Sequence, residues 1–320
     1  MPVSADQRPY PTITVLHAED RPPGLTLDRI RFATDHTLAH ALPGTEVLLV
    51  WDFTSDAVRE AWPAADALRW VHTASAGVDR LVFPELLDSP VTLTNSRGVF
   101  DVPMAEYVLG LVLAMAKDLP GTLALQSRRE WRHRESERVA GTCAVVVGGG
   151  PIGRATAGLL RAAGMRVELV GRRASDGVHA AEALPGLLPL ADWLVLAAPL
   201  TEATRGMLDA AALAALRPSA RVINVGRGAL VVEPDLVDAL RGGRLAGAAL
   251  DVFAQEPLPP ESPLWDLPGV IVSPHMSGDV LGWREELVEV FADNLARYRA
   301  GEPLLNVVDK TRGYVTGGTS

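Results

Sequence analysis

Short apolar runs divide the chain into two series of predicted strands and helices. Within the first hundred residues, four runs have the length and composition of buried strands, at residues 12–18, 46–53, 68–75 and 91–96. Helical or loop segments separate these runs. Strands that alternate with such connections predict a small parallel sheet built of βα units.

A helix and a longer βα series follow. Pro103 stands near the first turn of the predicted helix, where a missing N–H costs nothing. Apolar residues then recur at helical spacing, at Met104, Val108, Leu111, Val112 and Met115. Six near-continuous apolar runs come next, at 144–147, 166–170, 192–198, 221–225, 247–252 and 269–274, with predicted helices at 154–163, 209–216 and 234–241. This pattern is typical of a doubly wound parallel sheet covered on both faces.

The order of the two series predicts that one domain is inserted into the other. A last helix, 285–300, is expected to pack back on the first sheet. The predicted fold is therefore α/β with two Rossmann-like or flavodoxin-like parallel-sheet domains: residues 1–102 plus 288–320, and an inserted dinucleotide-binding domain, 103–287. The Gly- and Thr-rich tail, 311–320, is predicted to be disordered.

Composition narrows the classes of function. The 320 residues are 48% hydrophobic and 22% charged, with a net charge of −9, which argues against a nucleic-acid-binding protein. Basic residues gather at 128–138, but acidic residues interleave with them, and this predicts a solvated helix face. No signal peptide and no apolar stretch of 18 residues is visible, so we expect a cytoplasmic protein with no membrane partner.

Cysteine and histidine usage excludes two further kinds of site. The single cysteine, Cys143, cannot form an internal disulfide, and its place at the start of an apolar strand predicts a core thiol in a reducing compartment. The histidines outside the strand-end motif described below show no metal-ligand spacing, so no metal site is predicted.

The segment GGGPIG, residues 148–153, predicts a dinucleotide site. It fits G-x-G-x-x-G, directly follows a predicted strand and directly opens a predicted helix. Gly148 permits the tight turn, Gly150 lets a pyrophosphate approach the backbone, and Gly153 lets helix and strand pack closely. The helix start at Pro151 and Ile152 supplies N–H groups and the positive end of the helix dipole.

The end of the second strand in this series lacks the usual ribose ligand. An acidic residue commonly stands there and binds a ribose hydroxyl, but the sequence reads Gly171-Arg172-Arg173. The two guanidinium groups are suited to a 2′-phosphate, and Ser175 offers a hydroxyl. This favours NADP(H) as the cofactor, with NAD(H) possible. The alternative is that both arginines are solvated surface residues.

Three later strand ends carry polar residues that a plain scaffold does not need. Arg227 stands between two glycines past one strand, Asp251 and Glu256 follow the next, and His275 follows the last. Parallel strands share a carboxyl edge, so we expect these residues to face one crevice. There Arg227 would bind a 2-oxo acid, His275 would protonate its carbonyl oxygen, and Glu256 would hold the imidazole.

With these motifs, the chain resembles the D-isomer-specific 2-hydroxyacid dehydrogenases, and within them the glyoxylate/hydroxypyruvate reductases. The motifs run in order from SAGVD (75–79) and NSRGVFDVPMAEYVLGLVLA (95–114) through GGGPIG and PLTEAT (199–204) to INVGRGALV, GAALDVFAQEPLP and SPHMSG. The resemblance implies an oxidoreductase that is a homodimer, with an active-site cleft between two domains. It implies Arg227, Glu256 and His275 as catalytic residues.

The same resemblance implies the remaining site residues. Backbone amides near Ser75, Ala76 and Gly77 would receive the substrate carboxylate, and Trp51, just past the second strand, would contact substrate or pack in the core. The cofactor would be contacted by residues that follow the strands of the second series, namely Pro199, Thr204, Val225, Arg227, Asp251 and His275. Gly149 stands where the family commonly has a larger aliphatic residue, which predicts a looser turn.

The predicted function is NAD(P)H-dependent reduction of a small 2-oxo acid, such as glyoxylate or hydroxypyruvate, to the D-2-hydroxy acid. Two alternatives remain open. One is a dinucleotide-sensing interaction protein on the same fold, like the corepressors that the family includes. The other is an enzyme like phosphoglycerate dehydrogenase. The residues do not decide which 2-oxo acid is the substrate.

Overall fold

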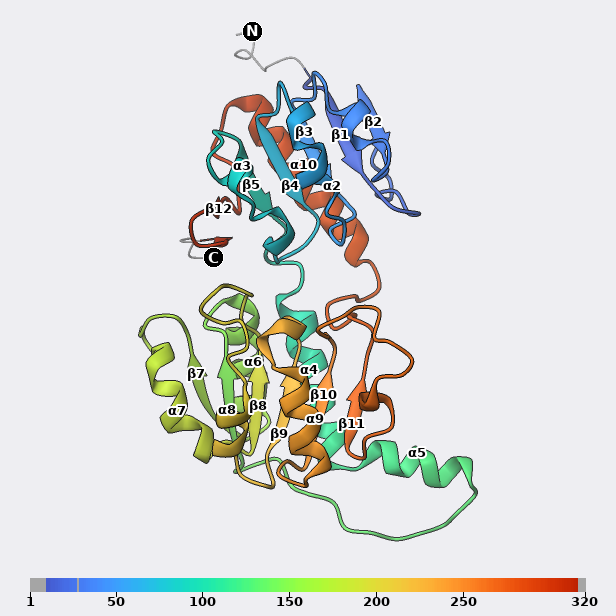
Figure 1. Ribbon diagram of the computed structural model, residues 1–320, viewed down its shortest axis with the longest axis vertical. Helices are drawn as coiled ribbons and strands as arrows, with labels where there is room; N and C mark the ends of the chain where they lie inside the picture. Colours follow the sequence, from blue (N-terminus) through green and yellow to red (C-terminus); the bar gives the residue numbers. More distant parts are fainter. Residues whose placement is uncertain (1–9, 28, 316–320) are drawn as a thin grey trace, which may run out of the picture. The chain divides into compact units, whose positions relative to one another are not determined.

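The computed structural model describes residues 10–27 and 29–315, which form two compact units (Figure 1). The first unit contains the chain up to Val99 and again from Val280, and the second contains Phe100–Asp279. The chain therefore leaves the first unit, builds the second, and returns.

The first unit is built on a parallel sheet of five strands in the order β2-β1-β3-β4-β5. The strands are β1 Ile13–Leu16, β2 Ile30–Ala33, β3 Val47–Val50, β4 Trp70–Thr73 and β5 Thr92–Asn95. Four of them match the predicted runs. β2 was missed because it is a half-exposed edge strand with the sequence IRFA, so it shows no continuous apolar run.

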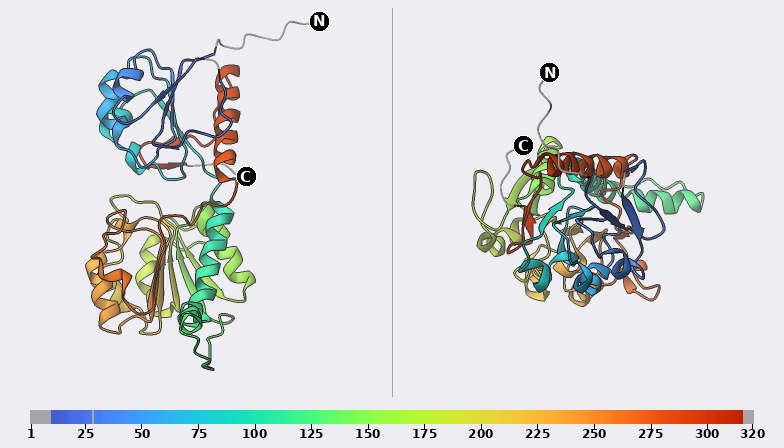
Figure 2. Two further views of the ribbon diagram at one scale, coloured as in Figure 1. Left: turned by 90° about the vertical axis from the view of Figure 1, so that its right-hand side faces the viewer. Right: turned by 90° about the horizontal axis from the view of Figure 1, so that it is seen from above.

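Helices cover both faces of this sheet. One face packs under short helices, α1 Leu38–Ala41, α2 Ala57–Ala61 and α3 Pro84–Leu87, with 3-10 turns at Trp62–Ala64 and Asp79–Leu81. The other face carries α10, Trp283–Ala300, the red helix in Figure 2. Phe291 of α10 stacks on Trp70 of β4 at a ring distance of 5.3 Å. The prediction that the last helix returns to the first sheet is confirmed.

The chain after α10 is ordered as far as it is described. β12, Val308–Asp309, pairs antiparallel with β13, Tyr314–Val315. The prediction of a disordered tail is therefore wrong for residues 311–315, while 316–320 lie outside the described residues. Lys310 between the two strands donates to three backbone carbonyls, those of Leu86, Ser89 and Val91. These bonds hold the hairpin against the end of α3.

The second unit is built on a parallel sheet of six strands in the order β11-β10-β9-β8-β6-β7. The strands, all predicted, are β6 Cys143–Val147, β7 Arg166–Val170, β8 Trp193–Leu196, β9 Arg221–Asn224, β10 Gly247–Leu250 and β11 Val270–Val272. β7, the strand that follows β6 in the sequence, lies on one side of β6 in the sheet, and β8 lies on the other side. This topological switch point, beside the glycine loop, is where doubly wound sheets bind ligands.

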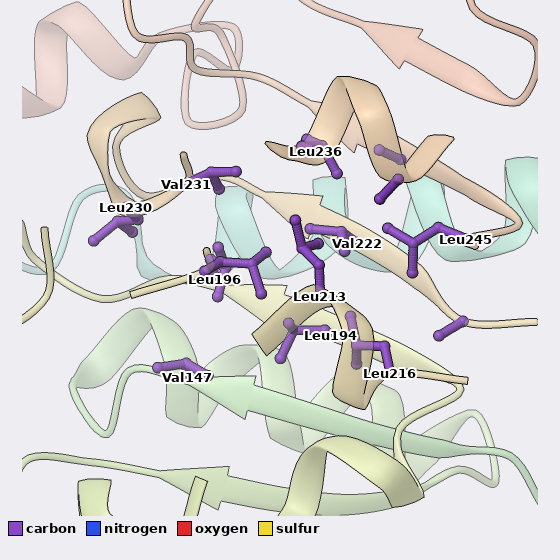
Figure 3. Close-up of a cluster of buried hydrophobic side chains, with 14 of the residues drawn as sticks. Val147, Leu194, Leu196, Leu213, Leu216, Val222, Leu230, Val231, Leu236 and Leu245 are labelled. Carbon is purple, nitrogen blue, oxygen red and sulfur yellow. The ribbon is translucent and has the colours of Figure 1, made fainter. Parts of the chain in front are cut away.

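Two apolar layers enclose this sheet. One lies under α4, Asp101–Ala116, and α6, Pro151–Ala162. The other, drawn in Figure 3, joins Leu194 and Val222 of the sheet to Leu213 of α8, Ala210–Ala215, and Leu236 of α9, Glu233–Arg241. Short turns complete the unit, α7 Leu184–Leu187 and 3-10 turns at Ala181–Ala183, Leu188–Leu190, Gly228–Leu230 and Pro263–Trp265. Cys143 is a buried thiol whose pKa is raised by burial.

The charged segment 128–138 is not helical, so the predicted solvated helix face is wrong. α5, Leu119–Ser127, ends before it, and the chain then runs without regular structure to β6. Ion pairs attach its second half to other segments: Arg134 reaches Asp118 at 2.7 Å, and Glu137 binds Arg221 through both oxygens at 2.7 and 2.9 Å. The charges pair with other segments instead of lining one helix, and the spacing offered no apolar face to bury.

No single helix among the described residues has the length and hydropathy of a membrane span. The bent pair α4 and α5, with a 62° break between the helices, has the length and hydropathy of a span only when the two helices are taken together, and this rests on length and composition alone.

Candidate active site

The glycine loop has the geometry of a dinucleotide site. Gly148 has a φ of 136°, and a Cβ there would lie 2.5 Å from the carbonyl oxygen of Ala197. At Gly153 a Cβ would lie 1.7 Å from the carbonyl oxygen of Gly148, so loop and helix touch through backbone alone. A Cβ at Gly150 would meet nothing within 4 Å. The loop leaves open space where a pyrophosphate approaches the start of α6, and the residues present therefore fit NAD(P).

Gly149 makes the turn tight, not loose as predicted. A Cβ at Gly149 would lie 3.1 Å from the Cα of Gly171 and 3.2 Å from a methyl carbon of Val178. A Cβ at Gly171 would lie 2.9 Å from the same methyl carbon. The backbone after β7 therefore packs directly on the glycine loop. An acidic side chain at position 171 would have to displace Val178.

The segment after β7 forms a closed turn that carries the two arginines. Ser175 and Val178 exchange backbone hydrogen bonds, and His179 continues beside Val170 as a parallel bridge. Arg172 and Arg173 are exposed on this turn. The structure thus places the three predicted 2′-phosphate ligands together on one short turn, beside the glycine loop.

Arg154 joins this group and was missed by the sequence analysis. Its Nε donates to the carbonyl oxygen of Gly149 at 3.1 Å, and its Nη2 lies 3.4 Å from Oγ of Ser175. It links the glycine loop to the turn that carries Arg172 and Arg173. Its position directly after Gly153 was the available signal, because it lies in the first turn of α6, the helix that follows the glycine loop.

Two turns at the ends of β8 and β9 border the same switch point. After β8, Oγ1 of Thr204 donates to the carbonyl oxygen of Pro199 at 2.8 Å and accepts from the N–H of Thr201. After β9, Val225 is buried. These three predicted cofactor residues, Pro199, Thr204 and Val225, all lie at the carboxyl edge of the sheet.

The loop that carries Arg227 is pressed against the loop that carries Glu256. Asn224 shapes the first loop, because its side chain accepts from the N–H of Gly226 and donates to the carbonyl oxygen of Arg227. A Cβ at Gly228 would lie 1.9 Å from the carbonyl carbon of Phe253. Only glycine allows the two loops to approach so closely, and this brings the charge of Arg227 near Glu256.

Glu256 and His275 form a hydrogen-bonded pair. Nδ1 of His275 lies 2.8 Å from Oε2 of Glu256, and Oε1 accepts from the N–H of Phe253 at 2.9 Å. Burial raises the pKa of Glu256, but the hydrogen bonds from His275 and Phe253, with the charges of His275 and Arg227, lower it further, so the net shift is downward. An ionised carboxylate accepts from Nδ1–H, which leaves Nε2 to exchange a proton with substrate.

Asp251 holds the loop that presents His275. The residue is fully buried, and its carboxylate accepts from the hydroxyl of Ser273 at 2.7 Å and from the N–H groups of Met276 and Ser277 at 3.0 and 2.9 Å. Its carbonyl oxygen accepts from the N–H of His275. His275 has a φ of 53°, a left-handed conformation rare for a non-glycine residue, and these bonds stabilise it. Asp251 therefore fixes the loop that carries His275.

In the first unit, the loop after β4 has all its carbonyl groups engaged. The carbonyl oxygen of Ser75 accepts from the N–H of Ser96 at 3.0 Å, and that of Ala76 accepts from Nδ2 of Asn95 at 2.6 Å. The hydroxyl of Ser75 donates to the carbonyl oxygen of Gly77 at 2.6 Å. Each of the three predicted residues is thus fixed in orientation.

This arrangement determines where the next amides point. A trans peptide places its C=O and the following N–H on opposite sides, so the N–H groups of Ala76, Gly77 and Val78 point away from these acceptor contacts. Within residues 10–27 and 29–315, none of the three N–H groups donates a hydrogen bond. Successive free amides of this kind suit a carboxylate. Trp51 follows β3 at the same edge of the sheet and is buried.

No group of three or more His, Cys, Asp or Glu residues in the described part of the chain is placed to hold a metal ion.

Comparison with known proteins agrees with this geometry. Residues 109–277 match the family model for the NAD binding domain of D-isomer specific 2-hydroxyacid dehydrogenases. The chain is 33% identical over 258 residues to glyoxylate/hydroxypyruvate reductase A of Serratia proteamaculans, an alignment that covers 77% of this chain and 82% of that protein.

Two solved structures are similar over almost the whole chain. A D-isomer specific 2-hydroxyacid dehydrogenase from Xanthobacter autotrophicus, in complex with NADPH and MES, has a TM-score of 0.80 at 33% identity and covers 96% of this chain and 100% of that one. An NADPH-dependent glyoxylate/hydroxypyruvate reductase from Sinorhizobium meliloti, with NADP and sulfate, has a TM-score of 0.78 at 30% identity, covering 95% and 100%.

The doubly wound sheet, the glycine loop and the neighbours with bound cofactor define an NAD(P)-dependent oxidoreductase. The chain belongs to the D-isomer specific 2-hydroxyacid dehydrogenase family, and its relatives include glyoxylate/hydroxypyruvate reductases.

Proposed function

We propose that this protein reduces a small 2-oxo acid of the glyoxylate or hydroxypyruvate class to the D-2-hydroxy acid, with NADPH as the preferred cofactor. The observation that carries the proposal is the 2.8 Å pair of His275 and Glu256 at the carboxyl edge of a nucleotide-binding sheet, with the loop of Arg227 packed beside it. Similarity to the glyoxylate/hydroxypyruvate reductases of Serratia and Sinorhizobium supports this substrate class.

The protein's own residues perform the proton chemistry. The bound cofactor supplies a hydride to the carbonyl carbon. His275, charged and held through Nδ1 by Glu256, donates the Nε2 proton to the carbonyl oxygen, so that a hydroxyl group forms and a neutral imidazole remains. Arg227 binds the carboxylate and polarises the carbonyl group. Solvent then returns a proton to His275, which completes the cycle.

The other site residues bind and position. The amides after Ser75, Ala76 and Gly77 receive the substrate carboxylate. Asp251 acts by fixing the loop of His275, because three donors occupy its carboxylate.

NADPH preference rests on charge around one turn. Arg154, Arg172 and Arg173 place three cations about Ser175, with Asp176 the acidic residue of that turn. An anionic 2′-phosphate would be favoured there, and the packing of Val178 on Gly171 disfavours the acidic residue that selects NADH.

The first experiment is a set of initial rates with glyoxylate, hydroxypyruvate and phenylpyruvate, each with NADPH and with NADH. Turnover that is faster with NADPH is expected. Turnover that favours NADH would keep the enzyme and reject the cofactor assignment. Tight cofactor binding without turnover on any 2-oxo acid would favour the sensor instead. His275→Ala is the control, and it should lose turnover while keeping cofactor affinity.

We further propose that the enzyme is a cytoplasmic homodimer. The single cysteine, buried and unpaired, suits a reducing compartment. Apolar side chains on and after α5, among them Leu123 and Trp131, are exposed in the single chain and suit a surface that a second copy covers.

A further inference from the structure

The chain that follows α10, at residues 305–309, lies along the free edge of β5 (Figure 1). The proposed carboxylate-binding loop, residues 75–78, is bonded to the residues that end and follow β5. Val307 forms an antiparallel bridge with Thr94. The carbonyl oxygen of Asn306 accepts from the N–H of Asn95 at 3.3 Å, and Nδ2 of Asn306 donates to the carbonyl oxygen of Arg97 at 2.9 Å. One residue near the end of the chain thus binds both sides of the turn that follows β5.

Asn306 is itself held firmly in place. On its N-terminal side, the fully buried Asn294 of α10 accepts from the N–H of Leu305 at 2.7 Å and donates to its carbonyl oxygen at 3.1 Å. On its C-terminal side, Lys310 fixes the hairpin to the carbonyl groups at the end of α3. The φ of Asn306 is 55°, which asparagine tolerates better than most residues.

The turn that Asn306 holds is the one that aims the amides. Oδ1 of Asn95 accepts from the N–H of Arg97 at 3.3 Å, and Nδ2 of Asn95 donates to the carbonyl oxygen of Ala76 at 2.6 Å. The orientation of the Asn95 side chain therefore depends on the 95–97 turn. The Ala76 carbonyl in turn fixes the direction of the N–H of Gly77, one of the three free amides.

We propose that Asn306 is a positioning residue for substrate binding, acting through Asn95 to hold the amides of residues 76–78 toward the carboxylate of the 2-oxo acid. This rests on the proposed function. Its two bonds go to Asn95 and Arg97, whereas Asn294 and Lys310 carry the attachment of the segment to the rest of the unit. Loss of the Asn306 side chain should thus loosen the carboxylate loop and leave the hairpin docked.

Two variants isolate the side chain. Asn306→Gly and Asn306→Asp both tolerate the left-handed backbone, and both keep the carbonyl bond to Asn95 while removing the donor to Arg97. Each should raise KM for glyoxylate about five- to tenfold, the worth of one hydrogen bond, with a small change in kcat. The Kd of NADPH, measured by cofactor fluorescence, should not change.

Lys310→Met is the matched control. It removes three bonds that hold the same hairpin but touches neither Asn95 nor Arg97, so it should lower Tm and raise KM much less than the Asn306 variants do. A direct readout is the Kd of oxamate, a 2-oxo acid analogue, for the enzyme with bound cofactor. This Kd should rise in the Asn306 variants in parallel with KM.

A double-mutant cycle with Asn95→Ser tests whether Asn306 acts on the loop through Asn95. If Asn306 acts through Asn95, Asn306→Gly should have little further effect in the Asn95→Ser background. Wild-type KM in both Asn306 variants, an equal rise in Lys310→Met, or full additivity in the cycle would each overturn the inference. If the wild-type enzyme neither turns over a 2-oxo acid nor binds oxamate, the proposed function fails and the inference fails with it.

Discussion

At the scale of single residues, Glu256 decides the chemistry available to His275. Both oxygens of Glu256 are used, one by the backbone N–H of Phe253 and the other by Nδ1 of His275. Because the pKa of Glu256 lies below its ordinary value, the carboxylate stays ionised well into the acid range. Nδ1–H is thereby fixed as the donor, which leaves Nε2 as the nitrogen that would deliver the proton in the proposed reduction.

Glu256→Gln should lower kcat by about a hundredfold, within the range of acid–base contributions, because the amide supplies no negative charge to the imidazolium. The measurement is kcat for glyoxylate reduction. An unchanged kcat would contradict the role of Glu256.

Arg172→Ala with Arg173→Ala should weaken NADPH binding about ten- to a hundredfold, the worth of a charge-assisted bond, and barely change NADH binding. Arg154→Gln should shift the two affinities in the same direction by less, because it keeps some hydrogen bonding to Ser175. Fluorescence titration measures both. Arg161→Gln, on the same helix but bound to Val167, is the control that should leave the NADPH to NADH ratio unchanged. Equal losses for both cofactors would reject the 2′-phosphate assignment.

At the scale of elements, a buried network of hydrogen bonds joins β4 to β5 and to Ser96, whose N–H also binds the carbonyl oxygen of Ser75 in the proposed carboxylate-binding loop. Nε1 of Trp70 donates to Oγ1 of Thr94, which lies 2.8 Å from Nδ1 of His72. Nε2 of His72 lies 3.2 Å from Oγ of Ser96, which donates to the carbonyl oxygen of Thr73. These directions require a neutral His72 with the proton on Nε2. Burial lowers the pKa of His72 to about 3.

The burial of neutral His72 in this network makes the stability of the first unit depend on pH. Between the ordinary pKa of 6.5 and the folded value of about 3, the unfolded chain binds a proton that folded His72 does not. The contribution of neutral His72 to the free energy of unfolding is thus fully present above pH 6.5. It is lost on acidification, by at most ~1.4 kcal/mol per pH unit. His72→Gln should have a lower Tm at about pH 7 but a smaller fall in Tm between about pH 7 and pH 4.5. Thermal unfolding followed by circular dichroism measures this, and parallel curves for the two proteins would refute it.

At the scale of the whole molecule, the surface around α5 is unusual for a single chain. The side chains of Leu123 and Trp131 are 64% and 101% exposed. The segment that carries Trp131 is nevertheless attached on both sides of that residue, by the N–H of Glu130 to the carbonyl oxygen of Leu125 before it and by Arg134 to Asp118 after it. A fixed backbone that presents large apolar side chains is typical of a protein–protein contact surface.

Leu123→Glu with Trp131→Glu should convert the proposed dimer to a monomer, because charged side chains are costly to bury in such a contact. Size-exclusion chromatography with light scattering measures the mass. Leu190→Glu is the control, since Leu190 is an exposed leucine outside α5 and the following segment, and it should leave the dimer intact. A wild-type chain that is monomeric, or a double variant that remains dimeric, would reject this surface.

The sequence by itself determined every strand of the second sheet and four of the five strands of the first, and it placed Arg227, Glu256 and His275, the proposed catalytic residues, after strands of the second sheet. These follow from local rules: buried parallel strands appear as apolar runs, and glycine at fixed spacing marks the loop that binds a dinucleotide. The edge strand β2 was not predicted, and the irregular segment 128–138 was wrongly predicted to be helical, because half-exposed and ion-paired segments have no apolar period.

Tertiary structure alone decided how the site is held. Nothing local shows that Asp251 lies under the loop of His275, that Gly228 must be small to pass Phe253, or that Asn306 binds the turn after β5. These partners are distant in sequence, and their hydrogen bonds and steric contacts exist only once the sheets have formed. The residues proposed to do the chemistry could be predicted from the sequence because they follow strands. The residues that orient them could not, since orientation depends on which segments the folded chain brings together.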